Sequence, residues 1–237
     1  MLNAYSSRWA SAPALRRQAG LSMVELMVGV AIGLFVVAGA TLAVSNQLGD
    51  NRRLMLETQI QQDLRAAADV ISRDIRRSGY WGKAETGIWA SGAAAAASNP
   101  YTGLQPAVSA TPASAVTFGY SRDAIEDDVL DVTDQSGFRL NSAGAIEMLV
   151  GGAWQALTDS TTLRVTSFQV TLNSVDLPLS CFNACAPGAL NCPPTQSVRN
   201  IGIAIAGQAV FDATVKRTAT ASVRIRNDVV TGACPAS

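Results

Sequence analysis

The sequence contains no histidine, which removes the commonest general base and the commonest protein ligand for transition metals. It also lacks the G-x-S-x-G, P-loop and H-E-x-x-H motifs that mark several large enzyme classes. Charged residues make up only 15% of the chain, and from Gly79 onward nine bases stand against twelve acids. A mildly acidic domain lacks the excess of basic residues that binds phosphate backbones, so nucleic acid is not an expected partner. We therefore expect a protein that is not an enzyme and that holds no cofactor or metal.

Cysteine is confined to the last quarter of the chain, at Cys181, Cys185, Cys192 and Cys234. An even number of cysteines behind an apolar N-terminal segment predicts an oxidising compartment and two disulfides. No C-x2-C pair is present, so a zinc site of four thiolates is a weaker alternative, as are free thiols. The turn signal Pro187-Gly188 favours pairing of Cys185 with Cys192, which leaves Cys181 for Cys234. Pairing of Cys181 with Cys185 is almost as plausible.

A long uncharged segment runs from Leu26 to Gly49. As a helix it would span about 36 Å, more than the roughly 30 Å core of a bilayer. The flank before it carries Arg16 and Arg17 and no acid, which predicts that the N-terminus stays cytoplasmic. The apolar run is too long for an ordinary signal peptide. Glu25, at its start, would be unfavourable in a simple membrane anchor unless another group paired with it.

The stretch Gly20-Leu21-Ser22-Met23-Val24-Glu25 resembles the processing signal of type IV prepilins. The resemblance is specific because a basic flank, the glycine, the glutamate at a fixed offset and the long apolar run occur together. It implies that a prepilin peptidase cuts between Gly20 and Leu21 and that Leu21 is then N-methylated. It also implies that Glu25, the fifth residue of the mature protein, pairs with the N-terminal amine of a neighbouring subunit during assembly.

The helix is expected to continue beyond the apolar segment, because apolar residues recur every three or four positions and form one helical face. These residues are Leu56, Ile60, Leu64, Ala67, Ile71 and Ile75. We predict one helix from Leu21 to Arg77 that ends near Gly79. The predicted organisation is a leader (1–20), a transmembrane or filament-core helix (21–49), an amphipathic continuation (50–78) and a β-rich head (79–237).

The head is predicted to begin with a loop over residues 82–115, which includes the alanine run Ala93 to Ala97. Alternating apolar or β-branched residues then predict strands. The predicted strands are Ala115–Tyr120, Gly137–Leu140, Ala145–Val150, Leu163–Leu172, Val198–Ala206 and Thr218–Arg226. The segment from Asn141 to Gly144 is a hairpin signal between two of them. The fold class is therefore α+β, with a long N-terminal helix packed on an antiparallel sheet, as in the spine of pilins.

Two groups of residues in the head could bind a ligand. The acids Glu126, Asp127, Asp128, Asp131 and Asp134 could hold Ca²⁺, but the EF-hand pattern is absent and a solvated acidic loop is the preferred interpretation. The aromatic residues Trp81, Trp89 and Trp154 could bind a ligand, but core packing is the preferred interpretation for them.

Three later segments resemble PilW-type minor pilins: Asp69 to Gly82, Trp154 to Leu157 and Val223 to Asn227. The resemblance implies a subunit that helps to initiate a type IV pilus and forms part of its tip, with roles in twitching motility and adhesion. The implied partners are the prepilin peptidase, other minor pilins, the major pilin, the inner-membrane assembly platform and a PilY-type tip adhesin.

The implied location is the inner membrane, with a single span and a periplasmic head, and then the extracellular pilus. Two alternatives remain. J-type pseudopilins of type II secretion share the general layout and the terminal pair Arg226-Asn227. A membrane-tethered periplasmic binding module or enzyme is the other, although no catalytic motif supports it.

Overall fold

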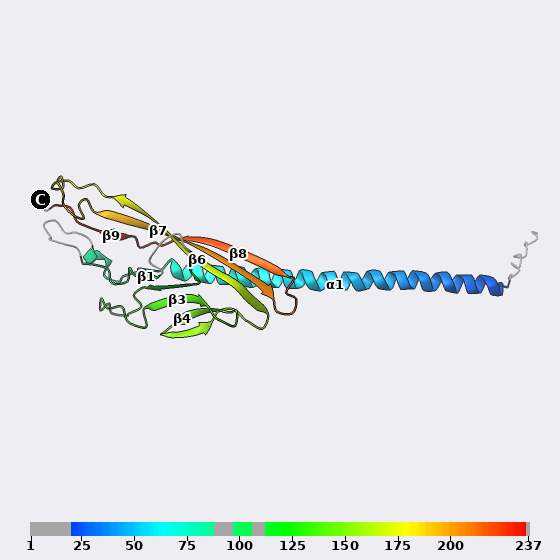
Figure 1. Ribbon diagram of the computed structural model, residues 1–237. Coiled ribbons are helices and arrows are strands. Elements are labelled where there is room, and N and C mark those ends of the chain that lie inside the picture. The colour runs from blue at the N-terminus through cyan, green and yellow to red at the C-terminus, as the bar shows by residue number, and fades with distance from the viewer. Residues whose placement is uncertain (1–19, 88–96, 106–111, 236–237) are drawn as a thin grey trace, which may run out of the picture. The chain divides into compact units, whose positions relative to one another are not determined.

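The computed structural model describes residues 20–87, 97–105 and 112–235 (Figure 1). The chain divides into two compact units, Met1–Asn51 and Arg52–Ser237. Helix α1 (Met23–Ile75) runs through both, and the second unit holds all the strands. The predictions for the leader before Gly20, for Trp89 and for the alanines up to Ala96 lie outside the described residues.

In the first unit, α1 is apolar and its side chains are exposed. Among the described residues, α1 alone is long and apolar enough to cross a membrane by length and composition. Its most apolar stretch of 18 residues has a mean hydropathy of 2.4, and none of that stretch is buried. The side chain of Phe35, for example, is 84% exposed. Such a continuous apolar surface is unfavourable in water and is stabilised by lipid or by other apolar helices.

In the second unit, α1 buries the apolar stripe that the sequence predicts. Its buried apolar residues are Ile60, Leu64, Ala67, Ala68, Ile71 and Ile75, and Leu56 is partly buried against them. The helix ends at Ile75, two residues before the predicted end at Arg77. A turn follows and leads to Gly79, whose φ of +74° lies in the left-handed region where glycine is favoured.

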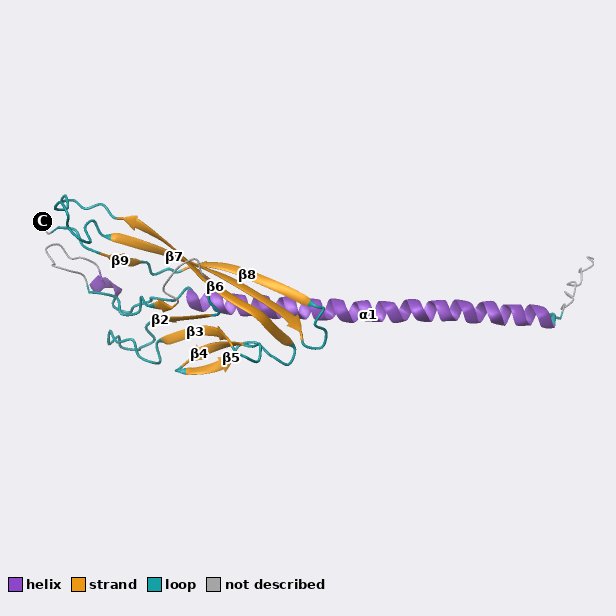
Figure 2. Cartoon of the chain, viewed as in Figure 1, coloured by secondary structure: helices purple, strands orange, loops and turns teal. Residues whose placement is uncertain are grey.

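The strands form two antiparallel sheets, which Figure 2 shows in orange. The first sheet, in the order β1-β2-β3-β4-β5, contains β1 (Leu104–Gln105), β2 (Ala115–Gly119), β3 (Gln135–Leu140), β4 (Ile146–Val150) and β5 (Ala153–Ala156). The second, in the order β6-β7-β8, contains β6 (Leu163–Pro178), β7 (Thr195–Ala209) and β8 (Lys216–Arg224), and β9 (Val229–Thr231) pairs with β7. A short 3₁₀-helix, η1, covers Ala84–Gly87. The α+β prediction is confirmed, with the strands divided between two sheets.

The hairpin prediction is also confirmed. Strands β3 and β4 pair with Leu140 opposite Ile146, and the turn between them contains Gly144 with a φ of +82°. The sequence did not predict β1, β5 or β9, which are only two to four residues long. The predicted strand that corresponds to β6 ended too early, at Leu172. The rest of β6 is exposed on both faces and has no alternating apolar residues.

A single apolar core joins α1 to residues of both sheets. Figure 1 shows β6, β7 and β8 running alongside the C-terminal part of α1. Gly207 on β7 permits this close packing, since a Cβ there would lie 3.3 Å from the Leu64 side chain and 2.7 Å from that of Leu163. A larger residue at this position would therefore require the side chains of Leu64 and Leu163 to move.

The core also contains a charged residue, Asp74, whose exposed fraction is 7%. The hydroxyl of Tyr120, directly after β2, donates a 3.0 Å hydrogen bond to one carboxylate oxygen of Asp74. The hydroxyl of Ser136 on β3 donates to the other oxygen. Both acceptors of the buried acid are thus satisfied by the first sheet, which links α1 to that sheet at a defined position.

We predict that Asp74→Ala lowers the free energy of unfolding by about 3 kcal/mol, because it leaves two buried hydroxyl groups without their charged acceptor. The matched control is Asp69→Ala on the exposed side of the same helix, for which we expect a change within about 0.5 kcal/mol. Urea unfolding of the full-length proteins in detergent, followed by tryptophan fluorescence, measures both. Equal effects of the two substitutions would contradict the structural role of Asp74.

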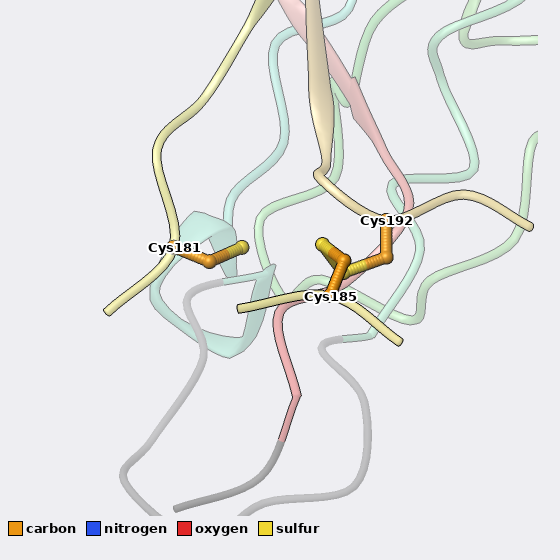
Figure 3. Close-up of side chains that lie close together, drawn as sticks. All are labelled: Cys181, Cys185 and Cys192. Carbon is orange, nitrogen blue, oxygen red and sulfur yellow. A yellow bond between two sulfur atoms is a disulfide. The ribbon is translucent and has the colours of Figure 1, made fainter. Parts of the chain in front are cut away.

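The loop between β6 and β7 is held by two disulfides. Cys185 and Cys192 close the loop on itself, with a Cα–Cα distance of 5.7 Å (Figure 3). Cys181 pairs with Cys234, just after β9, at a Cα–Cα distance of 5.4 Å. Of the arrangements considered from the sequence, the structure has the one suggested by the Pro187-Gly188 turn. No thiolate remains for a zinc site, because all four cysteines are paired.

Candidate processing and assembly site

The peptide bond between Gly20 and Leu21 lies just before α1, and both residues are exposed. The carbonyl of Ser22 accepts the first helical hydrogen bond, from the backbone N–H of Leu26 at 3.0 Å. Ser22 therefore occupies the N-cap position, which serine favours. A peptidase needs an extended substrate segment, and the helix begins only after the bond that the prepilin signal marks for cleavage. The local structure thus leaves the Gly20–Leu21 bond open to attack.

Glu25 lies in the first turn of α1, and its side chain is exposed. A carboxylate is favourable there because the free N–H groups carry partial positive charge at a helix N-terminus. Within residues 20–87, 97–105 and 112–235, no hydrogen bond or ion pair involves the Glu25 side chain. Cleavage would create an amine at Leu21, four residues earlier. The pairing of Glu25 with such an amine stays a prediction.

An accessible Gly-Leu bond, a helix that begins directly after it and a continuous exposed apolar surface define a class of N-terminally processed, pilin-like proteins. In agreement with this class, residues 15–41 match the family model of the prokaryotic N-terminal methylation motif. Residues 53–225, most of the chain, match the model of prepilin peptidase-dependent protein B, and the chain belongs to that family. No curated protein and no solved structure matches the chain significantly.

The family and the motif make the chain a type IV pilin-like protein that depends on prepilin peptidase. Its families consist of pilin-like structural proteins rather than enzymes. The apolar N-terminal helix is consistent with anchoring in the inner membrane.

Most of the acidic residues between Ser121 and Asp134 act as hydrogen-bond acceptors that fold their own loop. Glu126 accepts hydrogen bonds from the Tyr101 hydroxyl at 2.6 Å and from the backbone N–H of Gly82 at 2.9 Å. Desolvation by burial raises the pKa of Glu126, but hydrogen bonds from Ser121, Tyr101 and two backbone N–H groups outweigh it and lower the pKa to about 2. Glu126 therefore stays ionised and ties the acidic loop to the turn after α1.

The other acids of the cluster have similar local roles. Asp128 accepts from the Trp81 indole N–H at 2.8 Å and from Lys83 at 2.7 Å, and hydrogen bonds from these two side chains lower its pKa. Asp134 differs from the predicted solvated loop, because it is fully buried and accepts the backbone N–H of Arg122 at 2.9 Å. The carboxylates of Asp123, Asp131 and Asp134 lie within 4.8 Å of one another. Hydrogen bonds hold Asp131 and Asp134, whereas one carboxylate oxygen of Asp123 is buried without a hydrogen-bond partner. Burial and the neighbouring acids raise the pKa of Asp123.

Of the tryptophans that the structure describes, Trp81 is buried as predicted, whereas Trp154 is not a core residue. Trp81 is buried and donates to Asp128, as just described. Trp154 is partly exposed, and the guanidinium of Arg139 lies 4.2 Å above its ring, a cation–π contact on the surface of the first sheet. The core-packing prediction is therefore confirmed for Trp81 and wrong for Trp154.

The segment after β8 fixes the end of α1, a role that the sequence did not reveal. The side-chain amide of Asn227 donates to the backbone carbonyl of Ser78 at 2.9 Å. Arg199, only 7% exposed, donates to the carbonyls of Thr102 and Asn227 at 2.9 and 3.0 Å. Burial lowers the pKa of Arg199, while Asp228 nearby raises it. These bonds join β7, the helix end and the chain after β8.

Proposed function

We propose that this chain is a PilW-type minor pilin of a type IV pilus. In this proposal the prepilin peptidase removes residues 1–20 and methylates Leu21, and residues 21–49 form the membrane span and later the filament core. The amphipathic part, 50–78, carries the head, 79–237, which is periplasmic before assembly and extracellular afterwards. The subunit helps to initiate the pilus together with other minor pilins, the major pilin, the assembly platform and a PilY-type adhesin.

The proposal rests on three features that occur together at the start of α1. The open Gly20–Leu21 bond, the acid in the first helical turn and an apolar surface with no cover in the monomer occur in one segment. A membrane anchor alone would explain the apolar surface but not Glu25 at its edge. A filament subunit explains both, because neighbouring helices cover the apolar surface and a neighbouring amine pairs with the acid. The same helix carries a folded head, as a pilus subunit requires.

We predict that the mature protein begins at N-methylated Leu21. Tandem mass spectrometry of the N-terminal peptide, from cells with and without prepilin peptidase, measures this directly. Cells that have the enzyme should yield the methylated peptide, and cells that lack it should yield a chain that still carries Gly20. An uncut chain in both strains, or a cut after Gly49, would contradict the proposal.

A J-type pseudopilin remains the second candidate, since the pair Arg226-Asn227, just after β8, suits both groups. Both candidates share the processing step, so mass spectrometry does not separate them. Deletion of the gene separates the two candidates. Loss of a minor pilin changes the number of surface pili, whereas loss of a pseudopilin changes the amount of secreted protein. We expect the loss of pili, with secretion unchanged.

A further inference from the structure

A basic groove lies where the end of α1 meets the chain after β8. Its charged lining consists of Arg73, Arg76, Arg77 and Arg226, and Tyr80, Ser121 and Asn227 complete the wall. The groove has a volume of about 600 Å³. A second hollow of about 460 Å³, lined by Arg76, Arg224 and Arg226, continues it. We call the two hollows together the arginine groove, and among the described residues no acid lines either of them.

Most of these arginines have no internal partner. Among the described residues 20–87, 97–105 and 112–235, the side chains of Arg73, Arg76 and Arg226 form no hydrogen bond or ion pair. The other two have partners. Arg77 lies 4.0 Å from Asp74 and 4.4 Å from the centre of the Tyr120 ring, and Arg224 forms a 2.9 Å ion pair with Asp228. Arg73 lies in the last turn of α1 and Arg76 and Arg77 follow directly after it, so three like charges crowd one helix end. The stability of the fold therefore does not explain why these arginines lie together. Repulsion between like charges that the fold does not need is typical of a functional surface.

The backbone around the arginine groove is firmly held. Val223 and Ile225 are buried on either side of Arg224, and the N–H of Ile225 donates to the carbonyl of Arg199 at 3.0 Å. The hydrogen bonds of Asn227 secure the chain directly after Arg226. Guanidinium groups on such a fixed frame lose less conformational entropy when they bind an anion than groups on a mobile loop.

The ligand must carry several negative charges, since the groove presents arginines along its whole length. Guanidinium groups bind carboxylates and phosphates in bidentate geometry, so a protein acid and a phosphate polymer both fit locally. The surroundings distinguish the two. The acidic loop begins only two residues after Ser121, at Asp123, and Asp127 in that loop is exposed. A phosphate polymer leaving the groove would meet this like charge. A folded protein surface can place acids in the groove and bases on the loop.

We propose that the arginine groove binds a carboxylate-bearing segment of a neighbouring pilus subunit. This inference rests on the proposed function and adds to it the chemistry of a subunit contact. The adjacent acidic loop sets the orientation of the neighbour, because only one alignment matches both charges. Such complementarity acts mainly on specificity and rate of association, which suits a subunit that has to be recognised during assembly.

Tyr80 gives direct access to the groove, since it lines the wall and is 53% exposed. The test replaces it with the photoreactive analogue p-benzoylphenylalanine in the full-length protein, expressed in cells that assemble pili. Ultraviolet light should produce a protease-sensitive adduct with another pilus subunit. The cross-linked peptide of that subunit should contain aspartate or glutamate. In the background Arg76→Gln with Arg226→Gln, the yield of the adduct should fall at least about fivefold.

Two control variants keep the experiment specific. Arg65→Gln removes an exposed arginine of the same helix that does not line the groove, and it should leave the yield unchanged. The pair Arg76→Lys with Arg226→Lys should retain part of the yield, because charge remains while bidentate geometry is lost. Arg76 and Arg226 are both exposed, and unfolding curves of the variants verify that the head is intact.

Three results would overturn the inference: a nuclease-sensitive adduct, an adduct that is insensitive to the arginine substitutions, and the absence of any adduct. Sheared pili from the same cells are probed for the subunit in parallel. If no adduct forms but the subunit is present in pili, the inference fails and the proposed function stands. If the subunit is absent from wild-type pili, the proposed function fails as well.

Discussion

Replacing Glu25 with glutamine should lower the share of this subunit in sheared pili at least about tenfold, while membrane insertion and cleavage after Gly20 persist. The predicted cleavage would create a positive amine at Leu21, and the segment from Leu26 to Gly49 contains no base or acid. In an apolar filament core that amine needs a carboxylate. Glutamine cannot neutralise it, and an unpaired buried charge is unfavourable by about 3–5 kcal/mol.

The measurement compares the amount of the subunit in sheared pili with its amount in the membrane. Glu85→Gln is the matched control, because Glu85 is an exposed acid in η1, outside α1. We expect the control to assemble normally, since a surface substitution of this kind has little effect. Normal incorporation of the Glu25 variant would eliminate the pairing model and leave Glu25 as a residue of the membrane interface. If the Glu25 variant lowers the number of pili but leaves the amount of the subunit in each pilus unchanged, the subunit belongs to the initiating tip.

Loss of the disulfide between Cys181 and Cys234 should destabilise the head more than loss of the other. The two cysteines are 53 positions apart, and chain-entropy arguments assign a closure of that length about 4 kcal/mol. Cys185 and Cys192 are 7 positions apart, and the same arguments give about 2.5 kcal/mol. Urea unfolding of the two double serine variants, both as full-length proteins in detergent, measures the difference.

The two variants serve as controls for each other, because each removes two cysteines from the same loop region. Peptide mapping without reductant shows whether the remaining pair still forms in each variant. The prediction fails if the Cys185 and Cys192 variant is the less stable one. It also fails if mapping of the wild type finds Cys181 linked to Cys185.

Features that depend on neighbours in the chain were predictable from the sequence. The apolar stripe on α1, the β3–β4 hairpin and the glycine after the helix each follow from local spacing. The processing signal around Gly20 and Glu25 is likewise a local pattern. The extension of β6 beyond Leu172 was not predictable, because its residues there are exposed on both faces and only the pairing with β7 keeps them extended.

Apart from the pairing of Cys181 with Cys234, features that depend on distant parts of the chain were missed. Asp74 is an acid on a helix, and nothing near it in sequence shows that Tyr120 and Ser136 will supply its hydrogen bonds. The arginine groove has the same origin. Arg76 and Arg226 are distant in sequence, so their common groove exists only after α1 and β8 have packed. The segment Val223 to Asn227 did stand out in the sequence, but its partners were unknown.

The link between Cys181 and Cys234 also determines how the head carries mechanical force. A pull on the chain beyond Cys234 passes through the disulfide to Cys181, which follows the end of β6. The covalent path thus bypasses β7, β8 and β9, all of which lie between the two cysteines. These strands would otherwise peel apart one hydrogen bond at a time under tension. A load applied at the C-terminal end reaches β6 first, the strand with the longest pairing in the head.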